Sequence, residues 1–279
     1  MGSVIPIQDG TAKDAAMSQS NGNLHSTLIA KMKGQVMHVP DLLALFPGWP
    51  SGGRNRHYDR LKAKLDEVII TVHPDEKSRE RARKHDFAFM TSCWFPIAEW
   101  EEFYTVGISR FWLFHFDDAM DDNDGVVAGD LSASQRYRNQ ALKYICWSLG
   151  LENTGFGKMT EASAGFPAAP NLPNTTFKEF GDRMRGQTSI AFCGMLYTEL
   201  RKYIDYCGRE QGERLAGQIS KNVETYLGMR LYTGGVRPYG WITQLALGIR
   251  IPIWVIETTE MHQLLDELTY VIVLINASQ

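Results

Sequence analysis

From residue 57 onward, apolar residues recur at the three- and four-residue spacing of amphipathic helices. The first such stripe ends near His73-Pro74, and it consists of Tyr58, Leu61, Leu65, Val68 and Ile69. Strict two-residue alternation, which is typical of half-buried strands, is nearly absent from the chain. The pattern predicts an all-α fold in which eight or more helices pack as a single layered bundle around a central cavity.

Capping and turn residues place the other expected helices. An Asp or Ser side chain that can accept a hydrogen bond from a free helical amide, or a proline, precedes three of them. A long loop is expected over residues 154–174, which are rich in Gly, Pro, Ala and Ser. The helices are expected at about 75–90, 97–121, from 132 or 134 to 149, 176–206, 210–231, 240–251 and 259–276.

Two parts of the chain differ in composition. Residues 1–24 are polar and rich in Gly and Ser, without the apolar run of a signal peptide, and residues 39–54 are punctuated by Pro and Gly. We therefore expect residues 1–39 to form a disordered N-terminal segment and residues 40–279 to form one helical domain. The apolar run 271–275 is far shorter than the ~20 residues of a spanning helix, so no membrane segment is expected.

Composition narrows the possible partners and the compartment. The net charge of −3 and the absence of basic runs give no reason to expect binding to nucleic acid or to a membrane surface. The four cysteines are scattered and form no CxxC pair, as expected of reduced, buried thiols. These features predict a cytoplasmic protein, and they leave monomer and homodimer open.

An acidic cluster follows a strongly apolar, aromatic segment at residues 111–116. Asp117 and Asp121 stand four residues apart on one helix face, and Asp118 lies on the neighbouring face. Like charges at this spacing repel each other, and acid at a helix C-terminus also opposes the helix dipole. The cluster therefore requires a cation, unless it is simply a solvated acidic helix end.

Oxygen ligands of this kind favour Mg²⁺, or Mn²⁺, over zinc. An EF-hand loop is excluded, because aligning Gly125 to its glycine places Met120 and Leu131 where carboxylates are required. Bound Mg²⁺ usually completes its ligand shell with water and substrate phosphates. The sequence thus favours an aromatic pocket that is closed by a metal-bound phosphate.

The segment Phe116-Asp117-Asp118-Ala119-Met120-Asp121 resembles the Asp-Asp-x-x-Asp motif of class I terpene synthases, in the aromatic context of fungal sesquiterpene cyclases. The resemblance extends from about Pro40 to the C-terminus and includes residues 226–235. It implies the helical bundle of a single-domain class I terpenoid synthase, with Asp117, Asp118 and Asp121 as metal ligands. Prenyl diphosphate synthases share the motif but carry a second copy, which this chain does not have.

Arg230 is the second candidate for phosphate binding. It ends an amphipathic helix just before a Thr-Gly-Gly break, where its guanidinium could bind phosphate or could simply cap the helix at the surface. The resemblance implies that Arg230 senses the diphosphate, that Thr233 is a linker, and that the carbonyl of Gly234 promotes ionisation.

The resemblance also implies a second metal motif, Asn-Asp-x-x-Ser-x-x-x-Glu. Asn276 lies 46 residues after Arg230, the spacing expected for the Asn of this motif. Ala277 stands where the Asp should be, and the Ser and Glu would fall at positions 280 and 284, beyond Gln279. We therefore expect a class I domain that lacks its last helices, in which Asn276 is either a metal ligand or a frayed terminal residue.

Aromatic side chains could stabilise a carbocation, since cation–π attraction contributes ~0.5–2 kcal/mol per ring. Phe114, one turn before the acidic cluster, is the leading candidate to contact substrate. Phe87 and Trp241 are further candidates, for which ordinary core packing is the alternative. His115 is interpreted as a core histidine rather than a base.

The expected function is Mg²⁺-dependent ionisation and cyclisation of an isoprenoid diphosphate, farnesyl diphosphate, with release of diphosphate. Two alternatives stay open. One is a catalytically impaired or inactive truncated cyclase that acts at most as a diphosphate-binding helical protein. The other is a prenyl diphosphate synthase.

Overall fold

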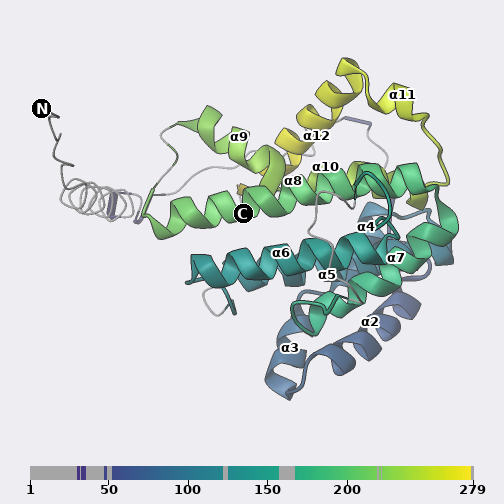
Figure 1. Ribbon diagram of the computed structural model, residues 1–279, viewed down its shortest axis with the longest axis horizontal. Coiled ribbons are helices and arrows are strands. Elements are labelled where there is room, and N and C mark those ends of the chain that lie inside the picture. Colours follow the sequence, from purple (N-terminus) through teal and green to yellow (C-terminus); the bar gives the residue numbers. More distant parts are fainter. Residues whose placement is uncertain are drawn as a thin grey trace, which may run out of the picture.

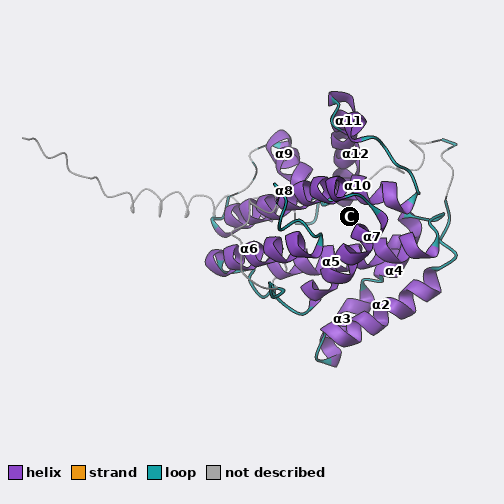
Figure 2. Ribbon diagram, turned by 45° about the vertical axis from the view of Figure 1, so that its right-hand side comes forward, coloured by secondary structure: helices purple, strands orange, loops and turns teal. Residues whose placement is uncertain are grey.

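The computed structural model describes residues 30–31, 33–35, 47–48, 52–121, 125–156, 167–218, 220 and 222–277, with only the backbone of 276 and 277. Most of the expected N-terminal segment 1–39, and residues 157–166 of the expected loop, lie outside the described residues. Within the described part every regular element is helical, and Figure 2 shows helices and loops only. The all-α prediction is confirmed.

The helices pack beside one another as a bundle (Figure 1). In Figure 1, α2 and α3 lie at one edge, α5, α6 and α8 in the middle, and α9, α11 and α12 at the opposite edge. The elements are α2 (Tyr58–Val72), α3 (Glu76–Lys84), α4 (Phe87–Trp94), α5 (Trp100–Asp121), α6 (Leu131–Ser148), η3 (Pro173–Thr175), α7 (Thr176–Gln187), α8 (Ile190–Leu215), α9 (Val223–Thr233), α10 (Val236–Ala246), α11 (Ile253–Ile256) and α12 (Thr259–Ala277).

Helix α5 is the central element of the bundle. It packs against α2, α4, α7, α8 and α10, and residues 103–112 are buried on every face. A helix that is apolar all round is suited to such a position. The apolar run before the acidic cluster therefore passes through the core, and the carboxylates lie where the helix leaves it.

Several helix boundaries differ from those predicted. The expected helix 75–90 is two helices, because Asp86 adopts a left-handed conformation (φ 39°) and caps α4 by accepting a hydrogen bond from the Phe89 amide. The expected helix 176–206 is broken at Thr188, after which Ser189 caps α8. Helix α8 continues to Leu215, so the expected helix 210–231 is wrong over its first part.

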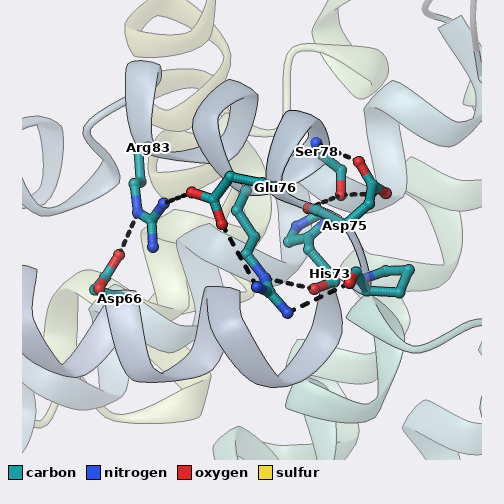
Figure 3. Close-up of polar contacts among 8 residues, drawn as sticks. Asp66, His73, Asp75, Glu76, Ser78 and Arg83 are labelled. Carbon is teal, nitrogen blue, oxygen red and sulfur yellow. Dashed lines mark hydrogen bonds and ion pairs between the residues drawn. The ribbon is translucent and has the colours of Figure 1, made fainter.

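The corner between α2 and α3 is fixed by a polar cluster (Figure 3). Arg83 contacts Asp66 and Glu76, each at 2.6 Å, while Asp75 caps α3 through the Ser78 amide at 2.9 Å. Each exposed ion pair contributes only about 0–1 kcal/mol. Together these contacts orient α3, which faces the acidic end of α5.

Helix α12 is held against the bundle by Arg237 of α10. The buried guanidinium contacts Glu199 of α8 at 3.1 Å, and it also binds Asp266 and His262 of α12. Gly240 gives α12 room to approach, since a Cβ there would lie 2.9 Å from a methyl carbon of Leu265. No helix in the described part of the chain is long and apolar enough to cross a membrane.

Candidate functional site

The three predicted carboxylates at the end of α5 face two different sides of the helix. Asp117 faces α8, where its Oδ1 accepts a hydrogen bond of 2.8 Å from the hydroxyl of Tyr203. Asp121 also faces α8, and its carboxylate lies 3.2 Å from Arg214. Asp118 instead lines a hollow of about 480 Å³ on the α3 side, together with His85.

Burial and a neighbouring negative charge disfavour the ionised form of the Asp117 carboxyl group. Burial raises the pKa of Asp117 to about 7, and the neighbouring charge of Asp121 adds to this rise. The hydrogen bond from Tyr203 and the positive charge of Arg230 lower the pKa without restoring its usual value. A further cation beside Asp117 would therefore favour its ionised form.

The pKa values of the other two carboxyl groups are also raised. Burial raises the pKa of Asp118, and the charges of His85 and Arg81 partly oppose that rise. Burial also raises the pKa of Asp121, with a contribution from Glu210, against the lowering effect of Arg214 and Arg230. The acidic cluster is thus only partly compensated by the protein, contrary to the alternative of a simple solvated helix end.

Arg214 supplies part of the positive charge that the acidic helix end requires. Its guanidinium donates hydrogen bonds to the carbonyls of Met120 (2.6 Å) and Asp121 (2.9 Å), which are among the last carbonyls of α5. Free carbonyls at a helix C-terminus carry partial negative charge and attract cations. Arg214 was not identified from the sequence, because 93 residues separate it from Asp121.

Arg230 lies close enough to the acidic cluster for its positive charge to offset part of the rise in the pKa values of Asp117 and Asp121. Its side chain is 25% exposed, and its Nη1 lies 3.4 Å from Glu210 Oε1 and 3.2 Å from Thr233 Oγ1. The Nε–H group of Arg230 is buried and has no hydrogen-bond partner within the described structure. A buried donor without a partner is costly, and an anionic ligand would satisfy it.

The break after α9 lies beside this guanidinium, as predicted. Thr233 is buried, and the amide of Gly234 donates a hydrogen bond of 2.8 Å to the carbonyl of Arg230. A Cβ at Gly234 would lie 2.8 Å from that carbonyl and 2.8 Å from Val273 of α12, so no other residue fits here without movement. Gly235 then turns the chain with φ +69°.

The predicted aromatic residues are only partly brought together. Phe114 stacks against Phe87 of α4 with ring centroids 5.3 Å apart, one turn below the acidic cluster. Trp241 instead packs edge-on against Phe192 at 5.1 Å. Phe192 lies eleven residues before Tyr203 on α8, about 16 Å along the helix at ~1.5 Å per residue. Trp241 is therefore remote from the carboxylates, and its contact with substrate stays a prediction.

Asn276 lies in the last turn of α12, but its side chain is outside the described residues. Nothing in the structure therefore tests it as a metal ligand. The sequence also missed Tyr203 and Glu210 of α8. Each belongs to an ordinary amphipathic helix pattern, and only the packing of α8 against α5 and α9 brings them to the site.

The donor chemistry of the site fits a hard divalent cation. Asp117, Asp118 and Asp121 offer only carboxylate oxygens, the ligands that Mg²⁺ and Mn²⁺ prefer. Among the described residues, no group of three or more His, Cys, Asp or Glu side chains is arranged to hold a metal. Asp118 faces the α3 side of α5, whereas Asp117 and Asp121 face α8. The ligand atoms are therefore of the type that such a cation prefers, but the carboxylates lie on two sides of α5.

Comparison with known proteins adds independent findings. Residues 111–277 match the family model described as "Terpene synthase family 2, C-terminal metal binding". The chain is 24% identical over 234 residues to sesquiterpene cyclase hepA of Aspergillus oryzae, covering 82% of this chain and 61% of hepA. It is 24% identical over 253 residues to terpene cyclase braA of Annulohypoxylon truncatum, covering 89% of this chain and 64% of braA. The chain thus spans less than two thirds of the length of either relative.

The fold is also found in solved structures. The crystal structure of the SVS_A2 protein, obtained by ancestral sequence reconstruction, superposes with a TM-score of 0.64 at 16% sequence identity. The superposition covers 77% of this chain and 62% of that protein. At this identity the likeness establishes the helical architecture alone.

Proposed function

This chain belongs to terpene synthase family 2, and from that premise we propose that it ionises and cyclises farnesyl diphosphate at the acidic end of α5. A relative named as a sesquiterpene cyclase, at 24% identity, supports this choice of substrate class. The observation that carries the proposal is the buried Nε–H group of Arg230, which has no hydrogen-bond partner among the described residues. The charge of the neighbouring Asp117 carboxylate is also only partly compensated. An anionic diphosphate with a divalent cation would satisfy both requirements.

Asp117 and Asp121 would hold Mg²⁺ or Mn²⁺ on the α8 side of α5. Asp118 would join them only after its side chain turns away from the α3 side, and Asn276 is proposed as a further ligand. The metal, when bound, supplies positive charge that stabilises the diphosphate leaving group. Arg230 binds and orients the same group by charge-assisted hydrogen bonds, after exchanging Glu210 for phosphate oxygens. Thr233 and Gly234 hold the helix break that aims the guanidinium.

The stacked rings of Phe87 and Phe114 have a separate role in this proposal. They lie one turn below the carboxylates and offer an apolar, π-rich surface that comes chiefly from the half-buried Phe114. Phe87 is only 3% exposed, and the rings of His85 and His115 lie against it. Such surface excludes water and attracts an allylic cation through its ring faces. We assign to these rings the part of the site that receives the isoprenoid chain.

A second candidate function has one specific observation in its favour. Ala277 occupies the position at which the second metal motif has its Asp. A protein without that ligand could bind diphosphate at Arg230 and yet fail to ionise it. Prenyl chain elongation has less support, because the sequence holds no second Asp-Asp-x-x-Asp motif.

Three measurements on the purified chain separate these functions. Incubation with Mg²⁺ and farnesyl diphosphate, followed by gas chromatography–mass spectrometry, should show a cyclic hydrocarbon or alcohol that is absent with EDTA and in Asp117→Asn. Calorimetry with inorganic diphosphate and Mg²⁺ should show binding that Arg230→Met removes. Binding without product would establish the impaired protein, and a longer prenyl diphosphate formed with added isopentenyl diphosphate would establish elongation. Absence of both binding and product would refute the proposed site.

A further inference from the structure

Two histidine rings meet at the edge of the hollow that Asp118 lines. His73, the residue after the last of α2, and His115 of α5 place their Nε2 atoms 2.9 Å apart. Both residues are half-buried, and both line the hollow of about 480 Å³. Because 42 residues separate them in sequence, only the packing of α2 against α5 brings the two nitrogen atoms together.

The hydrogen bond at the other ring nitrogen fixes the proton of His115. Its Nδ1 lies 2.8 Å from the carbonyl oxygen of Phe111, which can only accept, so we assign the proton of the neutral ring to Nδ1. The Nε2 atom of His115 then carries a lone pair directed at His73, whose own Nε2–H group donates the hydrogen bond between the rings. A histidine that binds a metal is commonly held in this way, by an Nδ1–H group that donates to a backbone carbonyl.

The separation of the two Nε2 atoms suits a shared metal ion. Bonds from Zn²⁺ to imidazole nitrogen are about 2.0–2.1 Å long, so two such ligands lie about 2.9 Å apart at a right angle and about 3.3–3.4 Å apart at the tetrahedral angle. The observed separation is within about 0.5 Å of either arrangement. To offer a second lone pair, His73 only exchanges its proton with water from Nε2 to Nδ1, and neither ring has to turn over.

The other charged groups of the hollow leave it open to a cation. Asp75 and Asp118 bring two carboxyl groups, while Arg81 brings one guanidinium and His85 an exposed ring. Among the described residues, no group of three or more His, Cys, Asp or Glu side chains is arranged to hold a metal. The protein therefore supplies two nitrogen ligands here, beside a space large enough for water molecules that would complete the shell.

We propose that His73 and His115 form a binding site for a transition-metal ion of the Zn²⁺ class, with water as the remaining ligands. Imidazole nitrogen suits Zn²⁺, Ni²⁺ and Cu²⁺, whereas the carboxylates of the acidic cluster suit Mg²⁺. The two sites thus select different ions, and they lie on different sides of α5. The ion at the histidine pair joins the end of α2 to α5, so it stabilises the folded chain whether or not the chain turns over a substrate.

The test is calorimetry of Zn²⁺ binding to the full chain with excess Mg²⁺ present. One ion should bind per chain, and His73→Gln should weaken it at least about tenfold, since even the loss of a group that only supports a metal ligand costs about 10–100-fold. His57→Gln is the matched control, because His57 is also half-buried but lies at the opposite end of α2. Asp117→Asn should likewise leave Zn²⁺ binding unchanged, which separates this ion from one at the acidic cluster.

Electron paramagnetic resonance with one equivalent of Cu²⁺ identifies the ligands. The wild-type spectrum should show hyperfine coupling to two imidazole nitrogens, and that of His73→Gln should show at most one. Zn²⁺ should also raise the urea midpoint of the wild type but not that of His73→Gln. His115→Gln is a second variant, and circular dichroism verifies folding. If the loss of this core ring prevents folding, the half-buried His73 carries the test alone.

Three outcomes would overturn the proposal. Absence of Zn²⁺ binding to the wild type would mean that the two rings form a hydrogen bond and nothing more. Equal affinity in the wild type and His73→Gln would place the ion elsewhere. Binding that excess Mg²⁺ or Asp117→Asn abolishes would assign the ion to the acidic cluster. None of these measurements requires a product, so they decide the question even if the chain does not convert farnesyl diphosphate.

Discussion

The hydroxyl of Tyr203 donates a hydrogen bond of 2.8 Å to Oδ1 of Asp117, joining α8 to the acidic end of α5. Tyr203 is buried, and its ring also packs against Phe116 at 5.9 Å. The hydrogen bond favours the ionised carboxylate while burial disfavours it. Tyr203 therefore acts as a positioning residue, which holds Asp117 in one orientation and supports its charge.

Tyr203→Phe should raise the Mg²⁺ concentration for half-maximal activity by about tenfold. The variant keeps the ring but removes a hydrogen bond to a charged group, which contributes about 1.5–3 kcal/mol. The pKa of Asp117 then rises further, and protons compete better with the metal. The measurement is product formation across a Mg²⁺ titration at fixed pH.

Tyr197→Phe is the matched control for that experiment. Tyr197 is a buried tyrosine on the same helix, and its hydroxyl has no hydrogen-bond partner among the described residues. Removing this hydroxyl should leave the Mg²⁺ dependence unchanged. An equal shift in both variants would mean that the effect comes from altered packing of α8 and not from Asp117.

The pair formed by Arg230 and Glu210 should respond asymmetrically to substitution. Arg230→Met should weaken the binding of inorganic diphosphate with Mg²⁺ at least about tenfold, because charge-assisted hydrogen bonds are lost. Glu210→Gln should strengthen that binding about two- to fivefold, since a partly exposed ion pair contributes at most about 1 kcal/mol. Calorimetry measures both effects. Arg209→Met, at an exposed neighbour on α8, is the control.

Weaker diphosphate binding in Glu210→Gln would contradict the idea that Glu210 competes with the ligand. It would instead make Glu210 a support that aims Arg230. Unchanged binding in Arg230→Met would remove Arg230 from the site altogether.

The acidic half of the site could be predicted from sequence because its residues are local. Asp117, Asp118 and Asp121 share one helix end, and their spacing alone indicates unbalanced charge. The helix break after Arg230 is equally compatible with a surface cap, and only the family resemblance, with the 46-residue spacing to Asn276, indicates a role in binding phosphate. The directions of the carboxylates could not be foreseen, since they depend on which helix packs on each side of α5.

The remaining residues of the site come together only through the packing of distant helices. Arg214 reaches the end of α5 only because α8 continues past Glu210, whereas the sequence pattern predicted a new helix there. Helix α8 ends at Leu215 and α9 begins at Val223; between them Gly217 adopts φ +65° and Asn222 caps α9. Capping by one Asn is a weak signal beside a continuous helical pattern. The general fold was therefore predictable, and the partners of the carboxylates were not.

Gly235→Ala should destabilise the protein by about 1–2 kcal/mol. The left-handed conformation at φ +69° costs a non-glycine residue roughly 1–2 kcal/mol, and the added Cβ would lie 3.1 Å from Leu113. Gly228→Ala on α9 is the control, since no atom lies within 4 Å of its Cβ position. That variant should be stabilised by about 0.4–1 kcal/mol, because alanine suits a helix better. Urea unfolding followed by circular dichroism compares the two; equal effects would contradict the conformational argument.

Asp86 should make the stability of the α2–α4 region depend on pH. Burial alone would raise the pKa of the Asp86 carboxyl, but hydrogen bonds from Lys62, Tyr58 and the Phe89 amide outweigh it, so the pKa is lowered. Because the pKa of Asp86 is lower in the folded than in the unfolded state, ionised Asp86 stabilises the fold. This contribution to the free energy of unfolding is fully present above the unfolded-state pKa, and it is lost as the pH falls through the folded-state pKa.

Asp86→Asn tests this contribution directly. Asparagine tolerates the left-handed conformation and can still cap α4, so the substitution removes the charge and little else. The wild-type urea midpoint should exceed that of the variant at pH 7, and the difference should shrink as the pH is lowered toward 3. Asp59→Asn, at an exposed position of α2 that makes no hydrogen bond or ion pair with this cluster in the described structure, should show a smaller difference at pH 7. A difference for Asp86→Asn that stays constant with pH would show that Asp86 acts through backbone geometry, because only its ionised form can attract Lys62.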